Sequence, residues 1–312
     1  MTRTYSAIVP NYNDGDQIHA SLASLAAQEF PFHEIIIVDD ASTDGSVDKI
    51  TALLAGIPQA KLLQHEQNKG VVGALNTGIA AATGDYIFLC SANDSYDPKM
   101  VAWCEEALNR HPEAGIVSGN VAAYDQAKGR FTYDMKLPLP QRPCYYTPDA
   151  LTNVSRRAAI HFNGGANALR LDRVRHYGGL TPELRWHSDW FLNLMIALDT
   201  GVSYVPENFL TCRLEGKKSY SSNRFHWKTE REVIRASLVH IARFPAQAAL
   251  FREAALLPKY DVRALPLLFE KKFRSFITPL LVWRLIMMTL VYRSKYIFPR
   301  PLLTALRPFV RL

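Results

Sequence analysis

Two acidic turns follow segments that have the composition of buried strands. Asp39 and Asp40 end one apolar run, and Asn93 and Asp94 follow another. In open α/β sheets ligands gather outside the carboxyl ends of the strands, so both turns stand where chemistry is expected. Two acidic turns on one sheet edge suit Mg²⁺ or Mn²⁺ holding a diphosphate, because these cations prefer oxygen ligands. The alternative is that these residues only form turns and helix caps.

The elements that would position these turns alternate regularly along the first third of the chain. Each of four strand-like segments is followed by a helical pattern of apolar residues, and the segments are 5–10, 34–38, 61–63 and 86–90. This alternation predicts an α/β fold with a mostly parallel central sheet flanked by helices. The glycine-rich fingerprint GxGxxG is missing after the first segment, which argues against a dinucleotide-dependent dehydrogenase.

The later part of the chain has a different pattern. Residues 128–157 are polar, interrupted by prolines and aromatic, which favours a substrate-facing insertion over a sheet unit. Asp189 then stands at the expected start of an apolar helix, where a carboxylate could also serve only the helix dipole. Residues 202–214 predict one or two strands, and the chain beyond residue 220 has mostly helical patterning.

Composition indicates a globular protein with a basic end. The chain has 312 residues, of which 48% are hydrophobic and 21% charged, and its formal net charge is +7. The basic residues from 271 onward have no acidic residue among them, and they are Lys271, Lys272, Arg274, Arg284, Arg293, Lys295, Arg300, Arg307 and Arg311. This end favours an anionic partner such as a membrane surface. Its alternatives are a helical cap on the domain and a dimer contact.

Several other classes are disfavoured by the sequence. The four cysteines lack CxxC spacing, which is typical of a reduced protein without a disulfide framework or zinc site. Nucleic-acid binding is not expected, because the charge is confined to one end and no reading helix or stacking module is evident. The most apolar segment, 276–292, is interrupted by Pro279 and Arg284 and is too short for a confident membrane span.

These motifs together resemble the family 2 glycosyltransferases, which have the GT-A fold. The resemblance covers residues from about 5 to 221 and excludes the basic end. Its motifs are the segments IVPNYN (8–13), IVDDASTD (37–44), NKG (68–70), GDYIFL (84–89) with Asn93 and Asp94, SDW (188–190), and Arg213 near Ser219.

The resemblance implies roles for individual residues. Pro10 and Tyr12 would frame the base of a nucleotide-sugar donor, Asp40 would accept its imide hydrogen, and Asp39 would support the loop. The remaining donor positions are Asn68, Gly70, Asn93 and Asp94, of which Asp94 would also contact Mn²⁺ or Mg²⁺. Asp189 would be the catalytic base that takes the proton of the acceptor hydroxyl.

Two positions depart from the family pattern. Ser91 stands where the metal motif usually begins with Asp, and the middle position of that motif is Asn93. Glu215 stands where the family often has His, and we hypothesise that it serves as a second metal ligand. These departures leave open a non-catalytic relative that binds nucleotide sugar or membrane. A nucleotidyltransferase with a similar α/β core is a third alternative.

The sequence therefore predicts an inverting hexosyltransferase that uses a UDP-sugar donor and a hydroxyl acceptor. We expect a GT-A domain over 1–222, with a nucleotide-sugar half of about 1–120 and an acceptor half of about 121–222. A helical basic region would follow over 223–312. The expected acceptor is a saccharide or lipid-linked saccharide of cell-surface polysaccharide or glycolipid synthesis. The expected location is cytoplasmic, peripheral on the inner face of the cell membrane.

Overall fold

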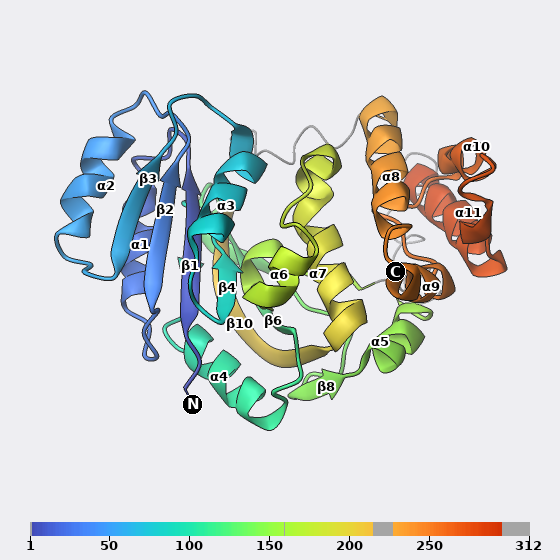
Figure 1. The fold of residues 1–312 in the computed structure, drawn as a ribbon, viewed down its shortest axis with the longest axis horizontal. Helices are drawn as coiled ribbons and strands as arrows, with labels where there is room; N and C mark the ends of the chain where they lie inside the picture. Colours follow the sequence, from blue (N-terminus) through green and yellow to red (C-terminus); the bar gives the residue numbers. More distant parts are fainter. Residues whose placement is uncertain (1, 159, 215–226, 295–312) are drawn as a thin grey trace.

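The computed structural model describes residues 2–158, 160–214 and 227–294, which form helices around one mixed sheet (Figure 1). The strands follow the order β3-β2-β1-β4-β9-β6-β10-β5, with β7 on β6 and β8 on β10. The strand bounds are β1 Tyr5–Asn11, β2 Glu34–Asp39, β3 Ala60–Gln64, β4 Tyr86–Leu89, β5 Ser95–Tyr96, β6 Ile116–Asp125, β7 Arg130–Met135, β8 Cys144–Tyr146, β9 Asn167–Arg170 and β10 Val202–Leu214.

The first four long strands confirm the predicted parallel unit. β1 pairs in parallel with β2 and β4, and β2 pairs in parallel with β3. In this register Asn11 lies opposite Asp39, and Ile8 lies opposite Leu89. The two acidic turns therefore leave the same edge of the sheet, as the sequence predicts.

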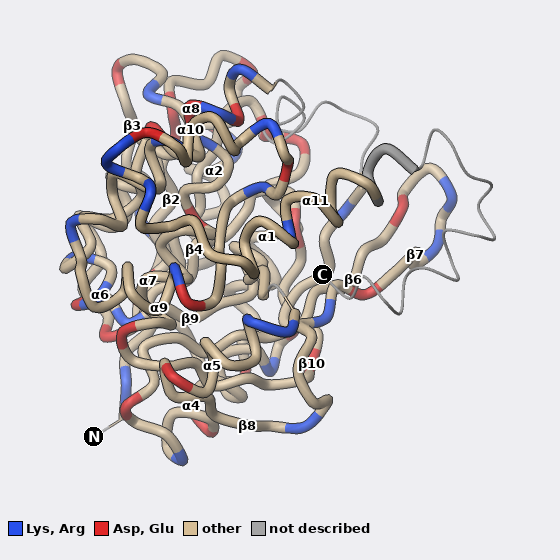
Figure 2. Tube along the Cα trace, turned by 90° about the vertical axis from the view of Figure 1, so that its right-hand side faces the viewer, with Lys and Arg blue, Asp and Glu red and all other residues tan. Residues whose placement is uncertain are grey.

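The rest of the sheet is mixed and corrects one expectation. β9 runs antiparallel between β4 and β6, which returns β6 to the direction of β4. The segment 128–157, predicted to lie outside the sheet, supplies β7 and β8 as well as helix α5 (Pro148–Ser155). Figure 2 shows β7 projecting beside β6. Its side chains are exposed from Arg130 to Asp134, so its pattern lacks the buried apolar residues by which sheet strands are recognised.

Helices cover both faces of the sheet. The bounds of the remaining helices are α1 Ile18–Ala26, α2 Ser46–Leu54, α3 Gly70–Ala81, α4 Met100–Arg110, α6 Leu171–His176, α7 Ser188–Thr200, α8 Trp227–Ile241, α9 Pro245–Glu253, α10 Leu265–Leu268 and α11 Pro279–Ser294. Successive β1 side chains alternate between two buried clusters, with Val9 in the cluster that holds α1 and α4. Ile8 lies in the cluster that holds α3 and α7. Strand alternation thus assigns each helix to one face.

The C-terminal helices pack against α7 and the elements around it. Apolar side chains of α8, α9, α10 and α11 belong to the same buried cluster as those of α3 and α7. Figure 1 shows these helices gathered on the side of α7 away from the parallel strands. The described part of the basic end is therefore a helical cap on the α/β body. The predicted boundary at residues 222 and 223 lies outside the described residues.

A buried arginine links the helices of this cap by hydrogen bonds. Arg284 of α11 is 1% exposed, and its guanidinium donates hydrogen bonds to the carbonyls of Ser155, Ala254 and Ala255. These carbonyls stand at the C-terminal ends of α5 and α9, where the helix dipole favours a positive charge. The C-terminal ends of α5 and α9 thus stabilise the positive charge of Arg284, and Arg284 in turn holds these two helix ends together.

We expect Arg284→Met to lower the free energy of unfolding by about 2–4 kcal/mol, because three carbonyls would lose a charged donor in a buried place. Urea unfolding followed by circular dichroism measures the change. Arg231→Met, at an exposed position of α8, is the matched control and should leave stability nearly unchanged. Equal stability of the two variants would contradict the fastening role of Arg284.

Candidate functional site

Asp39 is held at the end of β2 by the neighbouring strand. Its carboxylate accepts hydrogen bonds from Asn11 Nδ2 at 2.6 Å and from the backbone N–H of Ser42 at 3.0 Å, and its side chain is buried. The Ser42 hydroxyl in turn accepts from Asn11 Nδ2 at 3.1 Å and from the Asn13 N–H at 3.0 Å. Asp39 thus fixes the loops that follow β1 and β2 against each other.

Asp40 is buried and fixes a third loop. Its Oδ1 lies 2.7 Å from His65 Nδ1 and accepts the backbone N–H of Lys69 at 2.8 Å. The other nitrogen of His65 lies 2.8 Å from Thr77 Oγ1 on α3. Asp40 therefore connects the end of β2 to the turn that starts α3. The predicted contact of Asp40 with a nucleotide base stays a prediction.

Glycine is favoured where this turn enters α3. Gly70 has φ +76, a conformation that is strained for other residues, and its N–H donates to Asn68 Oδ1 at 3.0 Å. Two other residues of these loops, Asn13 and Ala41, have positive φ without being glycine. Such outliers concentrate at sites whose surroundings impose the geometry.

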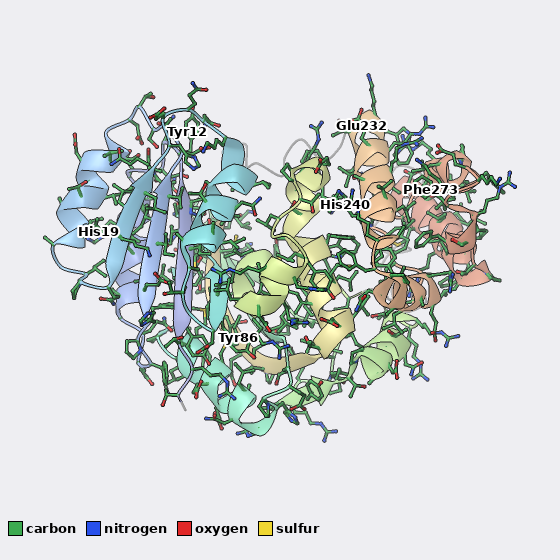
Figure 3. The ribbon with its side chains drawn as sticks, viewed as in Figure 1. Tyr12, His19, Tyr86, Glu232, His240 and Phe273 are labelled. Carbon is green, nitrogen blue, oxygen red and sulfur yellow. The ribbon has the colours of Figure 1, made fainter. Side chains whose placement is uncertain are left out.

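Tyr12 and Pro10 stand at the same edge. Pro10 lies in β1, and the Tyr12 side chain that follows it is 50% exposed. Figure 3 shows Tyr12 at the end of the parallel strands from which the acidic turns also leave. An exposed ring beside buried carboxylates has the form expected for a surface on which a flat base rests.

Asp94 differs from Asp39 and Asp40 because one of its two carboxylate oxygens has no hydrogen-bond partner among the described residues. The backbone of Arg213 and the side chain of Cys212, both on β10, hydrogen-bond to its carboxyl group. Burial nevertheless raises its pKa from 3.8 to about 6. Its Oδ1 is buried and has no hydrogen-bond partner among the described residues. A buried carboxylate oxygen without a donor favours a ligand that supplies positive charge.

The donor set at this turn fits a divalent cation that also binds phosphate. Mg²⁺ is often held by one or two carboxylates, several waters and substrate phosphates. Asp94 supplies one such carboxylate, while the Ser91 hydroxyl donates to Asn93 Oδ1. Within the described residues no group of three or more acidic, His or Cys side chains is arranged to hold a metal. Glu215, the second predicted ligand, lies outside the described residues.

Asp189 lies at the start of α7, as predicted, and is held tightly. Its Oδ1 accepts the N–H of Trp190 at 2.7 Å, and burial raises its pKa although nearby His187 opposes the shift. A Cβ on Gly164 would stand 2.2 Å from Asp189 Oδ2. The loop before β9 therefore approaches this carboxylate so closely that any side chain at position 164 would displace it. Arg185, four residues earlier, has φ +51.

Sequence reasoning missed several residues that build the site. Asn11 and His65 hold the two aspartates, and Gly164 faces Asp189. Asn11 and Arg213 stand in the motifs of the sequence, but nothing there indicates that Asn11 binds Asp39 or that the backbone of Arg213 contacts Asp94. The polar residues directly after the strands were the available signal for Asn11 and His65. No local pattern marks Gly164, because its neighbour comes from 25 residues further along the chain.

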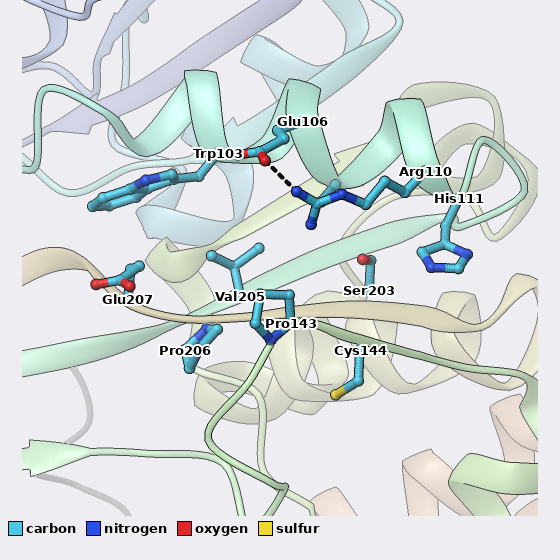
Figure 4. Close-up of a pocket in the computed structure, with 11 residues that line it drawn as sticks. Trp103, Glu106, Arg110, His111, Pro143, Cys144, Ser203, Val205, Pro206 and Glu207 are labelled. Carbon is cyan, nitrogen blue, oxygen red and sulfur yellow. Dashed lines mark hydrogen bonds and ion pairs between the residues drawn. The ribbon is translucent and has the colours of Figure 1, made fainter.

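One cavity lies away from these residues. It has a volume of about 200 Å³ and is lined by α4, the segment around Pro143 and the middle of β10 (Figure 4). Trp103 on its wall stacks on Phe209, and Glu106 pairs with Arg110. None of the predicted site residues lines it. Its lining side chains therefore serve mainly the packing of α4 on β10.

Comparison with known proteins identifies the family. The model of glycosyl transferase family 2 matches residues 6–176, and the chain belongs to this family. It is 30% identical over 133 residues to the glycosyltransferase GlyG of Streptococcus pneumoniae, which covers 43% of this chain and 44% of that protein. It is also 30% identical over 115 residues to a poly-beta-1,6-N-acetyl-D-glucosamine synthase of Staphylococcus epidermidis, covering 37% and 28% respectively. The matches thus span less than half of either relative.

Solved structures confirm the GT-A architecture. The Staphylococcus aureus TarS fragment 1-349 in complex with UDP-GlcNAc superimposes with a TM-score of 0.64 at 20% identity, covering 81% of this chain and 70% of that one. The mannosyltransferase PcManGT of Pyrobaculum calidifontis, in complex with GDP-Man and Mn²⁺, gives a TM-score of 0.51 at 19% identity. It covers 95% of this chain and 87% of that one. The chain therefore has the fold of these solved structures.

The raised pKa of Asp94 predicts that the free energy of unfolding falls as the pH rises. Between about pH 4 and 6 the folded chain binds more protons than the unfolded chain, so stability should fall as pH rises through this window. Asp94→Asn should remove that dependence and raise the free energy of unfolding at pH 7 by about 1–3 kcal/mol. Urea unfolding at several pH values measures it, with exposed Glu29→Gln as control. A destabilised Asp94→Asn variant would contradict this account of the carboxylate.

Proposed function

We propose that the protein transfers a hexosyl group from a UDP-sugar to a hydroxyl acceptor, with inversion at the anomeric carbon. The proposal depends most on Asp94, a half-buried carboxylate with one buried oxygen that lacks a partner, at the sheet edge where ligands of α/β folds bind. Asp189 supports it from the start of α7, where a second carboxylate with a raised pKa is held by Trp190.

Each part of the donor would meet a different set of residues. The base would rest beside Pro10 and Tyr12, while Asp39 and Asp40 hold the loops in place and Asp40 offers its carboxylate to the imide. Asn68, Gly70 and Asn93 would complete the donor pocket. Asp94 would hold Mn²⁺ or Mg²⁺ against the diphosphate. When bound, this cation supplies positive charge that stabilises the departing diphosphate.

Asp189 would act at the acceptor. Its carboxylate would take the proton of the acceptor hydroxyl while the oxygen forms a bond to the anomeric carbon. The bond from that carbon to the diphosphate breaks in the same displacement, so the configuration inverts and UDP leaves. Burial makes Asp189 a stronger base than an exposed aspartate. The backbone N–H of Trp190 keeps its carboxylate oriented.

The nucleotide and the acceptor are inferred from similar proteins. TarS has been solved with UDP-GlcNAc and with UDP, whereas the mannosyltransferase was solved with GDP-Man. The poly-beta-1,6-N-acetyl-D-glucosamine synthase is named for a polysaccharide product. We therefore propose a UDP-sugar donor and a saccharide or lipid-linked saccharide acceptor of cell-surface polysaccharide or glycolipid synthesis.

One observation favours a second candidate, a relative that binds nucleotide sugar without turnover. Asp94 is the one carboxylate of the segment 91–94, and the Ser91 hydroxyl in that segment donates a hydrogen bond to Asn93 Oδ1. Formation of UDP from a UDP-sugar only when acceptor and metal are both present would support the transferase. Binding of the UDP-sugar without any formation of UDP would support the second candidate.

We further propose that the cap rests peripherally on an anionic membrane surface. Trp283, Ile286 and Leu290 of α11 are 44–58% exposed, and their spacing of three and four residues gives one apolar stripe. The exposed basic residues nearby in the chain are Lys271, Lys272 and Arg274. Each such residue near anionic lipid contributes about 1 kcal/mol. In the described part of the chain no helix is both long and apolar enough to cross a membrane.

We expect Asp189→Asn to lower the rate of UDP release by about 10²–10⁴-fold, because the general base is lost, while UDP binding is kept. The raised pKa also predicts that wild-type kcat falls on acidification at a higher pH than an ordinary aspartate would give. Coupled detection of UDP across a pH series measures both effects. Asp48→Asn, at an exposed position, is the control. Undiminished kcat in Asp189→Asn would exclude the base role.

Sedimentation with vesicles tests the membrane contact. Wild type should pellet with phosphatidylserine-containing vesicles, and less so at high salt, because the basic residues are screened. Replacing Trp283, Ile286 and Leu290 by Ser should reduce pelleting, whereas Val239→Ser on exposed α8 should not. Absence of wild-type pelleting at low salt would rule out the proposed contact.

A further inference from the structure

We propose that Glu230 of the cap is a positioning residue for Asp189, and that it acts through His187. This inference rests on the proposed function, in which Asp189 takes the proton of the acceptor hydroxyl. His187 is the last residue of η2, a 3-10 helix over Pro182–His187, and α7 begins directly after it. Glu230 lies on α8. The cap thus takes part in the reaction, because one of its carboxylates controls the segment that leads into the base.

Three ion pairs join η2 to α8. Alternate residues of η2 supply them, and the nitrogen–oxygen distances are 4.0 Å for Glu183 with His240, 3.6 Å for Arg185 with Glu232 and 3.5 Å for His187 with Glu230. The carboxylates of the first two pairs are 66% and 56% exposed, whereas the Glu230 carboxylate is 1% exposed. Exposed ion pairs contribute little, because water screens them. The pair next to Asp189 is therefore the one that can hold its members in place.

Glu230 requires positive charge beside it, because a carboxylate out of water is costly unless it is paired. Its Oε2 lies 3.5 Å from His187 Nε2, and its Oε1 lies 3.6 Å from Lys259 Nζ. Lys259 also acts electrostatically on Asp261, so two carboxylates share its charge. Glu230 therefore attracts the imidazolium form of His187 and fixes the position of its ring.

His187 in turn stands beside the base. Its ring lies edge-on to Trp190, at 6.2 Å between centroids, and the backbone N–H of Trp190 donates to Asp189 Oδ1. Burial raises the pKa of Asp189, and the positive charge of His187 acts against that rise. Another titratable group at this helix start is His161, from the loop before β9, whose ring stacks on Trp190. A fixed imidazolium thus favours the ionised form of Asp189, which is the form that a base needs.

The backbone that leads into the base is strained and needs a restraint. Arg185 has φ +51 and ψ −124, a conformation that is unfavourable for a residue with a Cβ. Such a conformation persists only where the surrounding structure imposes it. The contact of His187 with Glu230 lies between Arg185 and Asp189 in the chain, so it restrains this backbone where it enters α7. Loss of the Glu230 carboxylate would release both the imidazole ring and the turn before Asp189.

Carbon-13 NMR of the full chain labelled at aspartate Cγ follows the ionisation of Asp189 directly, and Asp189→Asn identifies its signal. We expect His187→Gln to raise the pH midpoint of the Asp189 titration by about 0.5–1 pH unit, because a positive charge is lost. Glu230→Gln should raise the midpoint by a smaller amount, because it releases the imidazolium without removing it. In the double variant the midpoint should equal that of His187→Gln alone, because Glu230 acts through His187.

Glu232→Gln is the matched control. Glu232 lies on the same helix and pairs with the same segment, but both members of its pair are exposed, so the Asp189 midpoint should stay at its wild-type value. An unchanged midpoint in either His187→Gln or Glu230→Gln would overturn the proposal. A shift from Glu230→Gln that is equally large with and without His187 would also overturn it, because Glu230 would then act directly.

Formation of UDP from a UDP-sugar, measured with acceptor and metal across the same pH series, reports separately on the proposed function. The acidic limb of kcat should move with the Asp189 midpoint in each variant. If the wild type forms UDP but the midpoint does not respond to Glu230→Gln, this inference fails and the proposed function stands. If the midpoint responds as expected but no UDP forms, Glu230 still controls the ionisation of Asp189 and the proposed function fails.

Discussion

The hydrogen bond from Asn11 to Asp39 is the constraint on which the site edge depends. It joins residues that lie opposite each other in the register of β1 and β2, and it holds a carboxylate away from water. A buried charge without such donors would destabilise the fold. The loops after both strands are consequently fixed to each other through Ser42, and Asp40 extends the same connection to α3 through His65.

Asp94 shows the opposite arrangement two strands away. Donors surround Asp39 and Asp40, whereas Asp94 keeps a buried oxygen without a partner and a raised pKa. Hydrogen bonds within the fold therefore stabilise Asp39 and Asp40, whereas Asp94 keeps an oxygen that a ligand could contact. Such local destabilisation at a site, offset by packing elsewhere, is common where function requires a poised group. Part of that packing comes from the cap, where Arg284 of α11 donates a hydrogen bond to the carbonyl of Ser155.

The sequence predicted the parallel half of the fold because its strands are continuous apolar runs that end in polar turns. It also predicted the positions of Asp39, Asp94 and Asp189 in the fold, since each follows or begins a strongly patterned element. It failed for β7, whose exposed side chains carry no strand signal, and it left the packing of α11 on the domain as one of three alternatives. Contacts such as Gly164 with Asp189 or Arg284 with Ser155 join distant segments, and local periodicity contains no information about them.

Calorimetric titration of the wild-type protein with UDP, with Mn²⁺ and again with a chelator, tests the central claim most directly. If Asp94 and the diphosphate share a cation, UDP binding should be strong with Mn²⁺ and much weaker with the chelator, because the Asp94 carboxylate and the diphosphate would then repel each other. Equal affinity under both conditions would contradict the assignment of Asp94 as the residue that holds the cation.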